Sequence, residues 1–207
     1  IRDSNSHTQN HKNNRKTHNN TKRLTNLSGL RCVSHNINGI NKPQKRDEII
    51  HKYIIERIDI ICLIHTRLCQ SKQKQIENRY KQKYDIILNA NPTRGILVMI
   101  KNDRDIQWKV LHKKDDGNLI TLEIKFDNQT FVMHFAYAPS TDDISRIDFF
   151  KHLEHKMNET NIEMSIITGD LNVILNDKNK LNYIATPHMP TVQHVKNLII
   201  KKGLTDI

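Results

Sequence analysis

The stretch DIICLIHTRL, residues 59–68, constrains the fold more than any other part of the sequence. Residues 60–64 are all apolar and form a run too short for a typical helix, which predicts a buried strand. The strand ends at three polar residues, His65, Thr66 and Arg67. The chain is therefore expected to carry an imidazole from the end of a buried strand to a surface.

From Leu30 onward, strand-like and helix-like patterns alternate. A helix is predicted over residues 43–58, where apolar residues recur at helical spacing after Pro43. A short helix over 72–80, a helix over 142–158 and a final helix over 190–202 follow, the last capped by Gly203. Strands are predicted at 30–37, 60–64, 84–90, 96–102, 105–112, 118–126, 130–137 and 164–170.

The order of these elements favours one α/β architecture. Strand, helix and strand come first, then a run of consecutive strands, then helix, strand and helix. Regular alternation of strand and helix would predict a doubly wound parallel sheet, but the central run of strands does not fit one. Two stacked mixed sheets with helices outside fit the order better.

The composition is basic, with 33 Lys and Arg against 22 Asp and Glu and a formal charge of +11. This balance favours a polyanionic partner such as nucleic acid, although it also fits simple solubility. The three cysteines, Cys32, Cys62 and Cys69, show no framework spacing, which favours a reduced, intracellular setting. Cys32 and Cys62 are interpreted as core residues. No apolar run reaches the length of a membrane span, and no signal peptide is visible.

Residues 1–28 differ from the rest of the chain. They hold seven Asn, three His and six Lys or Arg, and they have few large apolar residues. Such a segment cannot bury enough surface to offset its ordering entropy, so it is predicted to be disordered. Two interpretations remain open: a basic arm that follows phosphates, or a solvated leader.

Polar side chains follow four of the predicted strands, at positions where a rigid strand releases the chain into a loop. Gly169 would let the backbone bend sharply before one of them. Each signal is weak alone, because Asn is common in turns, a tyrosine can be a core aromatic, and GDxN is often only a turn. The candidate residues are Asn36, Asn38, His65, Tyr137, Asp170 and Asn172.

Taken together, the motifs resemble the endonuclease/exonuclease/phosphatase superfamily, specifically the apurinic-like endonuclease domain of LINE-type (non-LTR) retrotransposons. The resemblance covers about residues 30–207. The matching segments, in order, are HNINGINKPQKRDEII, DIICLIHTRL, RGILVMI, FAYAPSTDDISRIDFF, IITGDLNVIL and LIIKKGLTDI.

The resemblance implies a DNase I-like four-layer α-β-β-α sandwich and a Mg²⁺-dependent phosphodiesterase that nicks DNA, with Mn²⁺ as an alternative ion. Asn36 and Asp170 would hold the metal, with Asn38 as a possible accessory. Tyr137 would face the scissile phosphate, Asp170 would also activate the attacking water, and Asn172 would bind a phosphate oxygen. A hard cation, an oriented water and neutral donors are what phosphate hydrolysis requires.

His65 departs from the family pattern. The family has Gln-Glu-Thr at this strand end, and the Glu is the main metal-binding carboxylate; here Ile64 and His65 stand in place of the Gln and Glu. Because Mg²⁺ prefers oxygen ligands, Mg²⁺ binding is expected to be at least about ten-fold weaker. His65 is either a degenerative substitution, or it serves a softer metal or acts as a general base.

The family domain continues beyond the point that corresponds to Ile207, with further strands and a terminal Ser-Asp-His. No Ser-Asp-His occurs in these 207 residues, so the domain is expected to be truncated and to leave sheet edges unpaired. His152 and His155 do not replace the missing histidine and are interpreted as part of a solvated helix face.

The leading hypothesis is a retrotransposon-derived, metal-dependent DNA endonuclease domain whose activity is impaired. Its expected partners are DNA and a reverse transcriptase domain on the same parent polypeptide, and its expected location is intracellular and, if functional, nuclear. One alternative is a non-catalytic nucleic-acid-binding remnant. Another is an active superfamily member acting on a lipid or sugar phosphate, which the basic charge makes less favoured.

Overall fold

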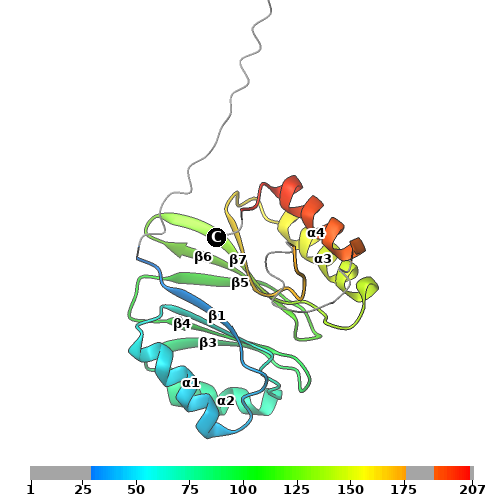
Figure 1. Ribbon diagram of the computed structural model, residues 1–207. Helices are drawn as coiled ribbons and strands as arrows, with labels where there is room; N and C mark the ends of the chain where they lie inside the picture. The colour runs from blue at the N-terminus through cyan, green and yellow to red at the C-terminus, as the bar shows by residue number, and fades with distance from the viewer. Residues whose placement is uncertain (1–28, 176–188, 206–207) are drawn as a thin grey trace, which may run out of the picture.

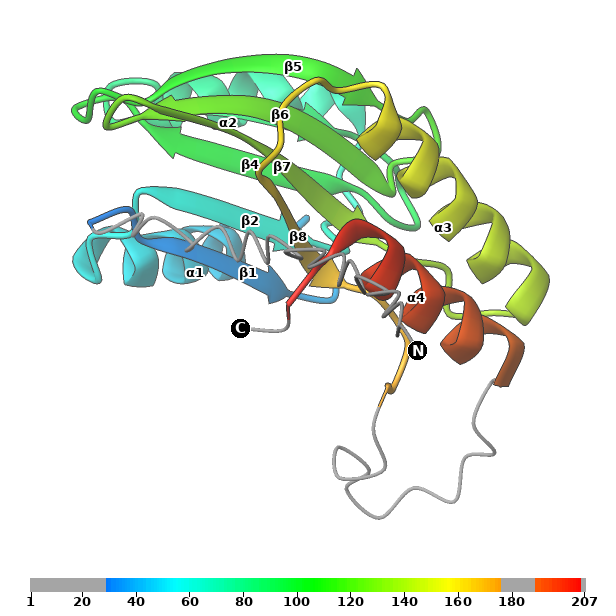
Figure 2. The same cartoon turned by 90° about the horizontal axis from the view of Figure 1, so that it is seen from above.

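The computed structural model describes residues 29–175 and 189–205, which form four layers. In chain order the elements are β1 (Cys32–Asn36), α1 (Pro43–Ile55), β2 (Ile60–Ile64), η1 (Gln70–Lys72), α2 (Gln73–Tyr80), β3 (Tyr84–Asn89), β4 (Ile96–Lys101), β5 (Gln107–Lys113), β6 (Leu119–Phe126), β7 (Gln129–Tyr137), α3 (Asp143–Asn158), β8 (Ser165–Asp170) and α4 (Met189–Lys202). Two sheets lie face to face, with α1 and α2 outside one and α3 and α4 outside the other (Figures 1 and 2).

Each sheet has four strands and mixes parallel with antiparallel neighbours. The strand orders are β1-β2-β4-β3 and β5-β6-β7-β8. β1 runs parallel to β2 and β7 runs parallel to β8, whereas all other neighbours are antiparallel. The predicted α/β sandwich of two mixed sheets with helices outside is therefore confirmed.

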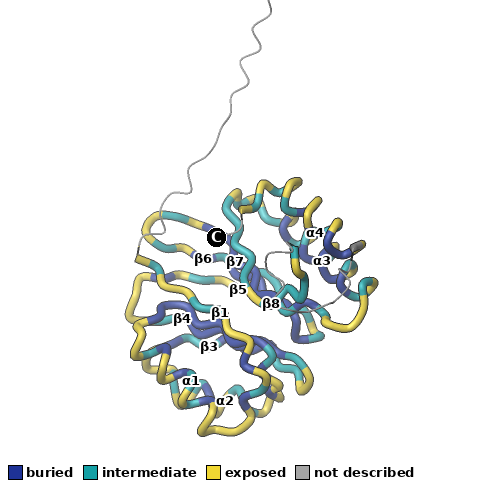
Figure 3. Tube along the Cα trace, in the orientation of Figure 1, coloured by how far each residue is buried: buried dark blue, intermediate teal, exposed yellow. Residues whose placement is uncertain are grey.

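The main core lies between the two sheets. Alternate residues of the strands point into it, as the two-residue period of a strand requires. β2 is buried along its whole length, because its other face packs against α1. Its neighbour β4 is buried in the same way apart from its last residue (Figure 3). The central cluster includes Ile60, Cys62, Ile64, Ile96, Val98, Ile100, Leu122, Ile124, Phe131, Met133 and Phe135.

Local signals set the ends of the helices much as the sequence predicts. Pro43 begins α1, and the helix ends just before Arg57, whose φ is 54°. Asp142 caps α3 by accepting a hydrogen bond from the Ser145 N–H at 2.8 Å. This bond, together with those from the Ser145 and Thr141 hydroxyls, lowers the pKa of Asp142 to about 2. Gly203 ends α4 with a φ of 61°.

One core prediction is wrong. Cys62 is fully buried, as predicted, but Cys32 is exposed. The reason is that β1 is an edge strand whose residues are half-buried or exposed, so an apolar strand pattern does not place Cys32 in the core.

The predicted disorder of residues 1–28 falls outside the described residues. None of the helices in the described ranges has the length and apolar character needed to cross a bilayer.

Candidate active site at the strand ends

The carboxyl ends of two parallel strand pairs meet at one place. Asn36 ends β1, Tyr137 ends β7 and Asp170 ends β8, while His65 directly follows β2. β8 lies in contact with both β1 and β2, and β2 also contacts β7, so the two sheets bring these ends together. The structure thus gathers four side chains that the sequence singled out, from strands up to 134 positions apart. Their roles in catalysis and metal binding remain predictions.

Asp170 is the polar centre of this group. Its Oδ2 accepts a hydrogen bond from Asn36 Nδ2 at 2.7 Å, and its Oδ1 accepts one from the Asn172 N–H at 3.1 Å. The first bond joins one sheet to the other, and the second closes a tight turn directly after β8. The carboxylate is therefore held in one orientation by an amide from the facing sheet and by its own loop.

Gly169 allows β8 to place Asp170 there. Its φ of 142° is a conformation that L side chains rarely adopt. A Cβ at this position would lie 1.9 Å from the Ala136 carbonyl oxygen on the neighbouring strand. The predicted need for glycine is thus explained by two constraints, backbone conformation and close approach to β7.

The two remaining amide candidates are used largely within turns. Asn172 has a φ of 47°, and its Nδ2 donates to the Ala138 carbonyl at 2.7 Å. Asn38 has a φ of 46°, and its N–H donates to Asn36 Oδ1 at 3.3 Å. Asn172 thus commits one amide hydrogen to the backbone, and Asn38 contributes backbone geometry beside the site. Both contacts agree with the turn interpretation, and a phosphate contact by Asn172 stays a prediction.

His65 lies on Tyr137. The two rings stack with centroids 5.0 Å apart and an interplanar angle of 27°. The backbone of His65 is left-handed, with a φ of 59°, and the Gly39 N–H holds its carbonyl at 2.7 Å. Arg67 Nε donates to His65 Nε2 at 2.9 Å. Because Nε2 accepts this bond, the imidazole is neutral and carries its proton on Nδ1.

The electrostatics keep the His65 ring neutral and the Tyr137 phenol protonated. Burial and then the Arg67 charge lower the pKa of His65, outweighing Asp170, which raises it. Burial and then Asp170 raise the pKa of Tyr137, against the opposing effect of Arg67 and Arg94. Near neutral pH the phenol is therefore a hydrogen-bond donor, which is the form that a phosphate oxygen requires.

Arg67 and Arg94 are members of the site that the sequence reasoning missed. The Arg67 N–H donates to the Arg94 carbonyl at 2.7 Å, which joins their two loops. Both charges act on Tyr137. The signal was present in the segments DIICLIHTRL and PTRG, but neither has a spacing that marks an arginine as part of a site.

These residues do not fit a tightly held Mg²⁺ ion. Among residues 29–175 and 189–205, no three His, Cys, Asp or Glu side chains are arranged to hold a metal. Asp170 supplies one carboxylate, Asn36 directs its Nδ2 at that carboxylate, and the His65 Nε2 lone pair is taken by Arg67. Since Mg²⁺ demands oxygen ligands in octahedral geometry, one carboxylate with an amide is a weak site.

A hollow of about 320 Å³ lies elsewhere, at the turn between β6 and β7. β7 starts at this turn and ends at Tyr137, so the hollow is at the opposite end of the strand from the candidate site. It is lined mostly by polar residues of the hairpin and of the start of β5. It does not coincide with the residues gathered around Asp170.

Comparison with solved structures identifies the fold as DNase I-like. An AP endonuclease from Archaeoglobus fulgidus matches with a TM-score of 0.62 and 17% identity, over 83% of this chain and 70% of that one. The AP endonuclease LMAP from Leishmania major matches with a TM-score of 0.64 and 14% identity, over 84% and 66%. D. rerio TDP2 complexed with a single strand DNA product matches with a TM-score of 0.54 and 15% identity, over 70% and 61%.

The chain thus spans about two thirds of the length of these proteins. At such identities the likeness establishes the fold and leaves the activity to be argued from the site. No protein-family model matches the sequence.

Proposed function

We propose that this chain is a DNA-binding, nuclease-derived domain from a LINE-type retrotransposon whose metal-dependent phosphodiester cleavage is impaired. The observation that carries the proposal is that the side chain of His65 is already engaged by neighbouring residues. The side chain that stands where the family has its metal-binding carboxylate instead stacks on Tyr137 and accepts a hydrogen bond from Arg67. The strand-end geometry is retained around it, centred on the Asn36–Asp170 hydrogen bond.

The retained groups suit a phosphodiester. The Tyr137 hydroxyl is a neutral donor, and the guanidinium groups of Arg67 and Arg94 can each donate to phosphate oxygens. With Asp170 the group carries two positive charges against one negative charge. Such a site attracts an anion, whereas a site built for a divalent cation carries an excess of carboxylates. The overall charge of +11 adds a long-range attraction to nucleic acid.

Two kinds of support favour DNA over other phosphate esters. Two of the similar structures are described as AP endonucleases, and a third was determined with a single strand DNA product. The motifs around the strand ends also resemble those of retrotransposon endonucleases, in order and along most of the chain. On this origin, the expected partners are DNA and a reverse transcriptase on the same parent polypeptide. The expected location is intracellular, and nuclear if the domain is functional.

What remains of the hydrolytic chemistry rests on Asp170. Its fixed carboxylate can accept a proton from a water molecule, while Tyr137 and the arginines stabilise charge on the phosphoryl oxygens. Mg²⁺ or Mn²⁺ would supply further charge neutralisation when bound, but the residues present hold it weakly. The non-catalytic remnant is therefore a second candidate, favoured because the described residues contain no group of three His, Cys, Asp or Glu side chains that could hold a metal ion.

A nicking assay combined with a binding assay tests the proposal. Supercoiled plasmid is incubated with the chain and Mg²⁺ or Mn²⁺, and retention of DNA on a filter is measured against salt concentration. We expect salt-dependent retention together with slow nicking that is lost in the variant Asp170→Asn. Retention without any nicking selects the second candidate. Nicking at the rate of an intact endonuclease would contradict the impairment, and absence of both activities would contradict DNA as the ligand.

A further inference from the structure

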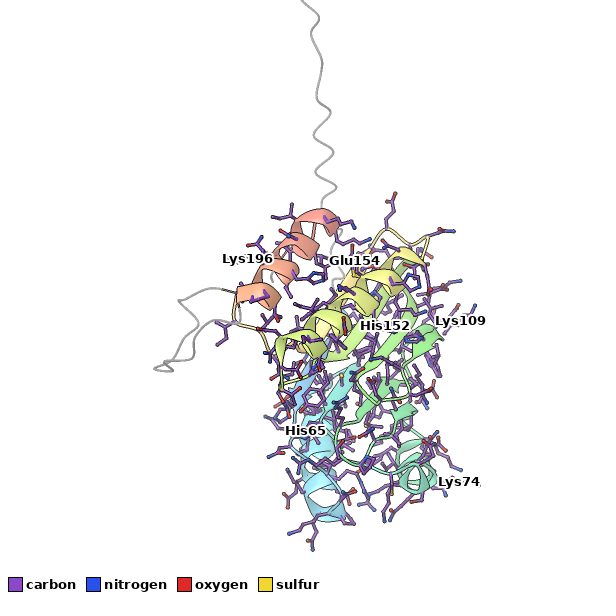
Figure 4. The ribbon with its side chains drawn as sticks, turned by 90° about the vertical axis from the view of Figure 1, so that its right-hand side faces the viewer. His65, Lys74, Lys109, His152, Glu154 and Lys196 are labelled. Atoms are coloured by element: carbon purple, nitrogen blue, oxygen red, sulfur yellow. The ribbon has the colours of Figure 1, made fainter. Side chains whose placement is uncertain are left out.

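Two histidines contact each other outside the strand-end site, that is, the group of Asn36, His65, Tyr137 and Asp170. His112 lies near the end of β5 and His152 lies on α3, on the side of the helix that faces the β5 strand (Figure 4). Their Nε2 atoms are 3.0 Å apart, and their ring centroids are 5.0 Å apart with an interplanar angle of 51°. The interpretation of His152 as part of a solvated helix face is therefore wrong, because its ring is half-buried against the sheet.

A β-bulge positions His112 for this contact. The register between β5 and β6 shifts between Val110 and His112, so that one extra residue stands on β5. A bulge re-aims the side chains that follow it. His112 is thereby paired with Thr121 of β6, on the face that α3 covers.

The distance between the two nitrogens matches that of two ligands on one metal ion. Imidazole nitrogens bind zinc at about 2.0–2.1 Å. Two such bonds place the nitrogens about 2.9 Å apart when they meet at a right angle and about 3.4 Å apart when they meet at the tetrahedral angle. The observed 3.0 Å lies within this range. A cation can therefore replace the proton that the two rings share without separating α3 from β5.

We propose that His112 and His152 form a two-histidine site for a divalent transition metal ion, such as Zn²⁺ or Ni²⁺, with water completing the coordination. Imidazole nitrogen selects such ions over Mg²⁺ and Ca²⁺, which prefer oxygen. The site is separate from the strand-end site and shares no residue with it. It would link the helix layer to the edge strand of its sheet.

The surroundings of the pair keep both imidazoles neutral and include charged side chains of both signs. Burial lowers the pKa of both histidines, and neighbouring lysines lower it further, so both rings are neutral near pH 7, the form that binds a metal. The nearby carboxylate of Glu159 is already engaged by Lys156 at 2.8 Å and His155 at 3.0 Å. The charged groups that act on the pair are Lys114, Asp115, Asp116, Lys156 and Glu159.

Metal titration of matched variants tests the site. The metal-stripped full chain is titrated with Zn²⁺ at pH 7.5 by calorimetry, beside His112→Gln, His152→Gln and His155→Gln. His155 is the control, because it lies on the same helix but is 68% exposed and contacts Glu159. We expect one class of Zn²⁺ sites to weaken at least ten-fold in the first two variants and to be unchanged in the third. The other histidines of the chain are present in all four proteins, so their contribution to Zn²⁺ binding is the same in each.

Equal binding by wild type, His112→Gln and His152→Gln would overturn the proposal, as would an equal loss in His155→Gln. A second measurement covers a variant that fails to fold. Ring resonances of the wild-type histidines are followed while paramagnetic Ni²⁺ is added. Selective broadening of the His112 and His152 signals supports the site, and broadening confined to other histidines overturns it.

Discussion

The imidazole of His65 and the phenol of Tyr137 are stacked at 5.0 Å, with Arg67 bonded to the exposed edge of the imidazole at Nε2. The stack joins the end of β2 in one sheet to the end of β7 in the other. It leaves His65 without a free lone pair, because Nδ1 carries the proton. A neutral ring that contacts Tyr137 and Arg67 thus occupies the position at which the resemblance predicts a carboxylate.

Restoring the carboxylate should restore affinity for a hard cation. The variant His65→Glu places a second negative charge beside Asp170 and frees Arg67 to pair with it or with a phosphate. We expect Mg²⁺ affinity to rise at least about ten-fold, equivalent to about 1.4 kcal/mol. Competition with Mn²⁺, followed by electron paramagnetic resonance, measures the change.

The matched control is His65→Gln, which keeps the size and polarity of Glu but adds no charge. It should leave Mg²⁺ affinity near that of the wild type. If His65→Glu gains nothing over His65→Gln, position 65 is not the equivalent of the family's metal-binding position, and the impairment has another cause.

Arg67 and Arg94 should contribute separately to DNA binding. If each neutralises one phosphate, Arg67→Ala or Arg94→Ala should weaken binding for all sequences and reduce the slope of log K against log salt by about 1. Filter binding at several salt concentrations measures the slope. Lys74→Ala is the control, since Lys74 is exposed on α2 and distant from His65 in Figure 4. An unchanged slope in both arginine variants would place the DNA elsewhere.

The sequence predicted the layers well because they depend on short-range patterns. Ile60–Ile64 is continuously apolar and is buried throughout, and the Asp142 cap and Pro43 mark the starts of two helices. The grouping of Asn36, His65, Tyr137 and Asp170 came from motif resemblance, and the structure places them together. Whether they act on a phosphate is still a prediction.

What the sequence could not predict depends on tertiary contacts. The Arg67–His65 bond joins two residues on either side of Thr66 that both have a left-handed backbone, with φ values of 55° at Arg67 and 59° at His65. Such values are uncommon for any residue other than glycine. The His112–His152 contact joins residues 40 positions apart through a bulge that no local pattern marks. The exposure of Cys32 follows from the position of β1 at a sheet edge, which depends on strand order.

Replacing Gly169 should destabilise the fold strongly. In Gly169→Ala the new methyl group would meet the Ala136 carbonyl oxygen at 1.9 Å, in a backbone conformation that alanine disfavours. We expect the free energy of unfolding to fall by at least about 3 kcal/mol. Gly203→Ala is the control, because its φ is also positive but no atom lies within 4 Å of the added carbon. It should cost about 1–2 kcal/mol, and urea denaturation distinguishes the two.

A buried histidine should make stability depend on pH. His134 is fully buried on β7, and its Nδ1 contacts Thr121 Oγ1 at 3.1 Å while its Nε2 has no partner. Burial lowers its pKa from 6.5 to about 4. Between these values the unfolded chain binds a proton that the folded chain does not bind. This contribution to stability is therefore complete above pH 6.5 and is lost as the pH falls toward 4.

The loss should reach about 3 kcal/mol at pH 4, because each unit of pKa difference corresponds to 1.36 kcal/mol. Urea denaturation at intervals from pH 7.5 to 4 measures it. The variant His134→Phe cannot bind the proton, so its free energy of unfolding should fall by that much less over the same interval. The Thr121 hydroxyl loses its partner in this variant, which lowers stability equally at every pH. Parallel curves for the two proteins would show that His134 is protonated in the folded state.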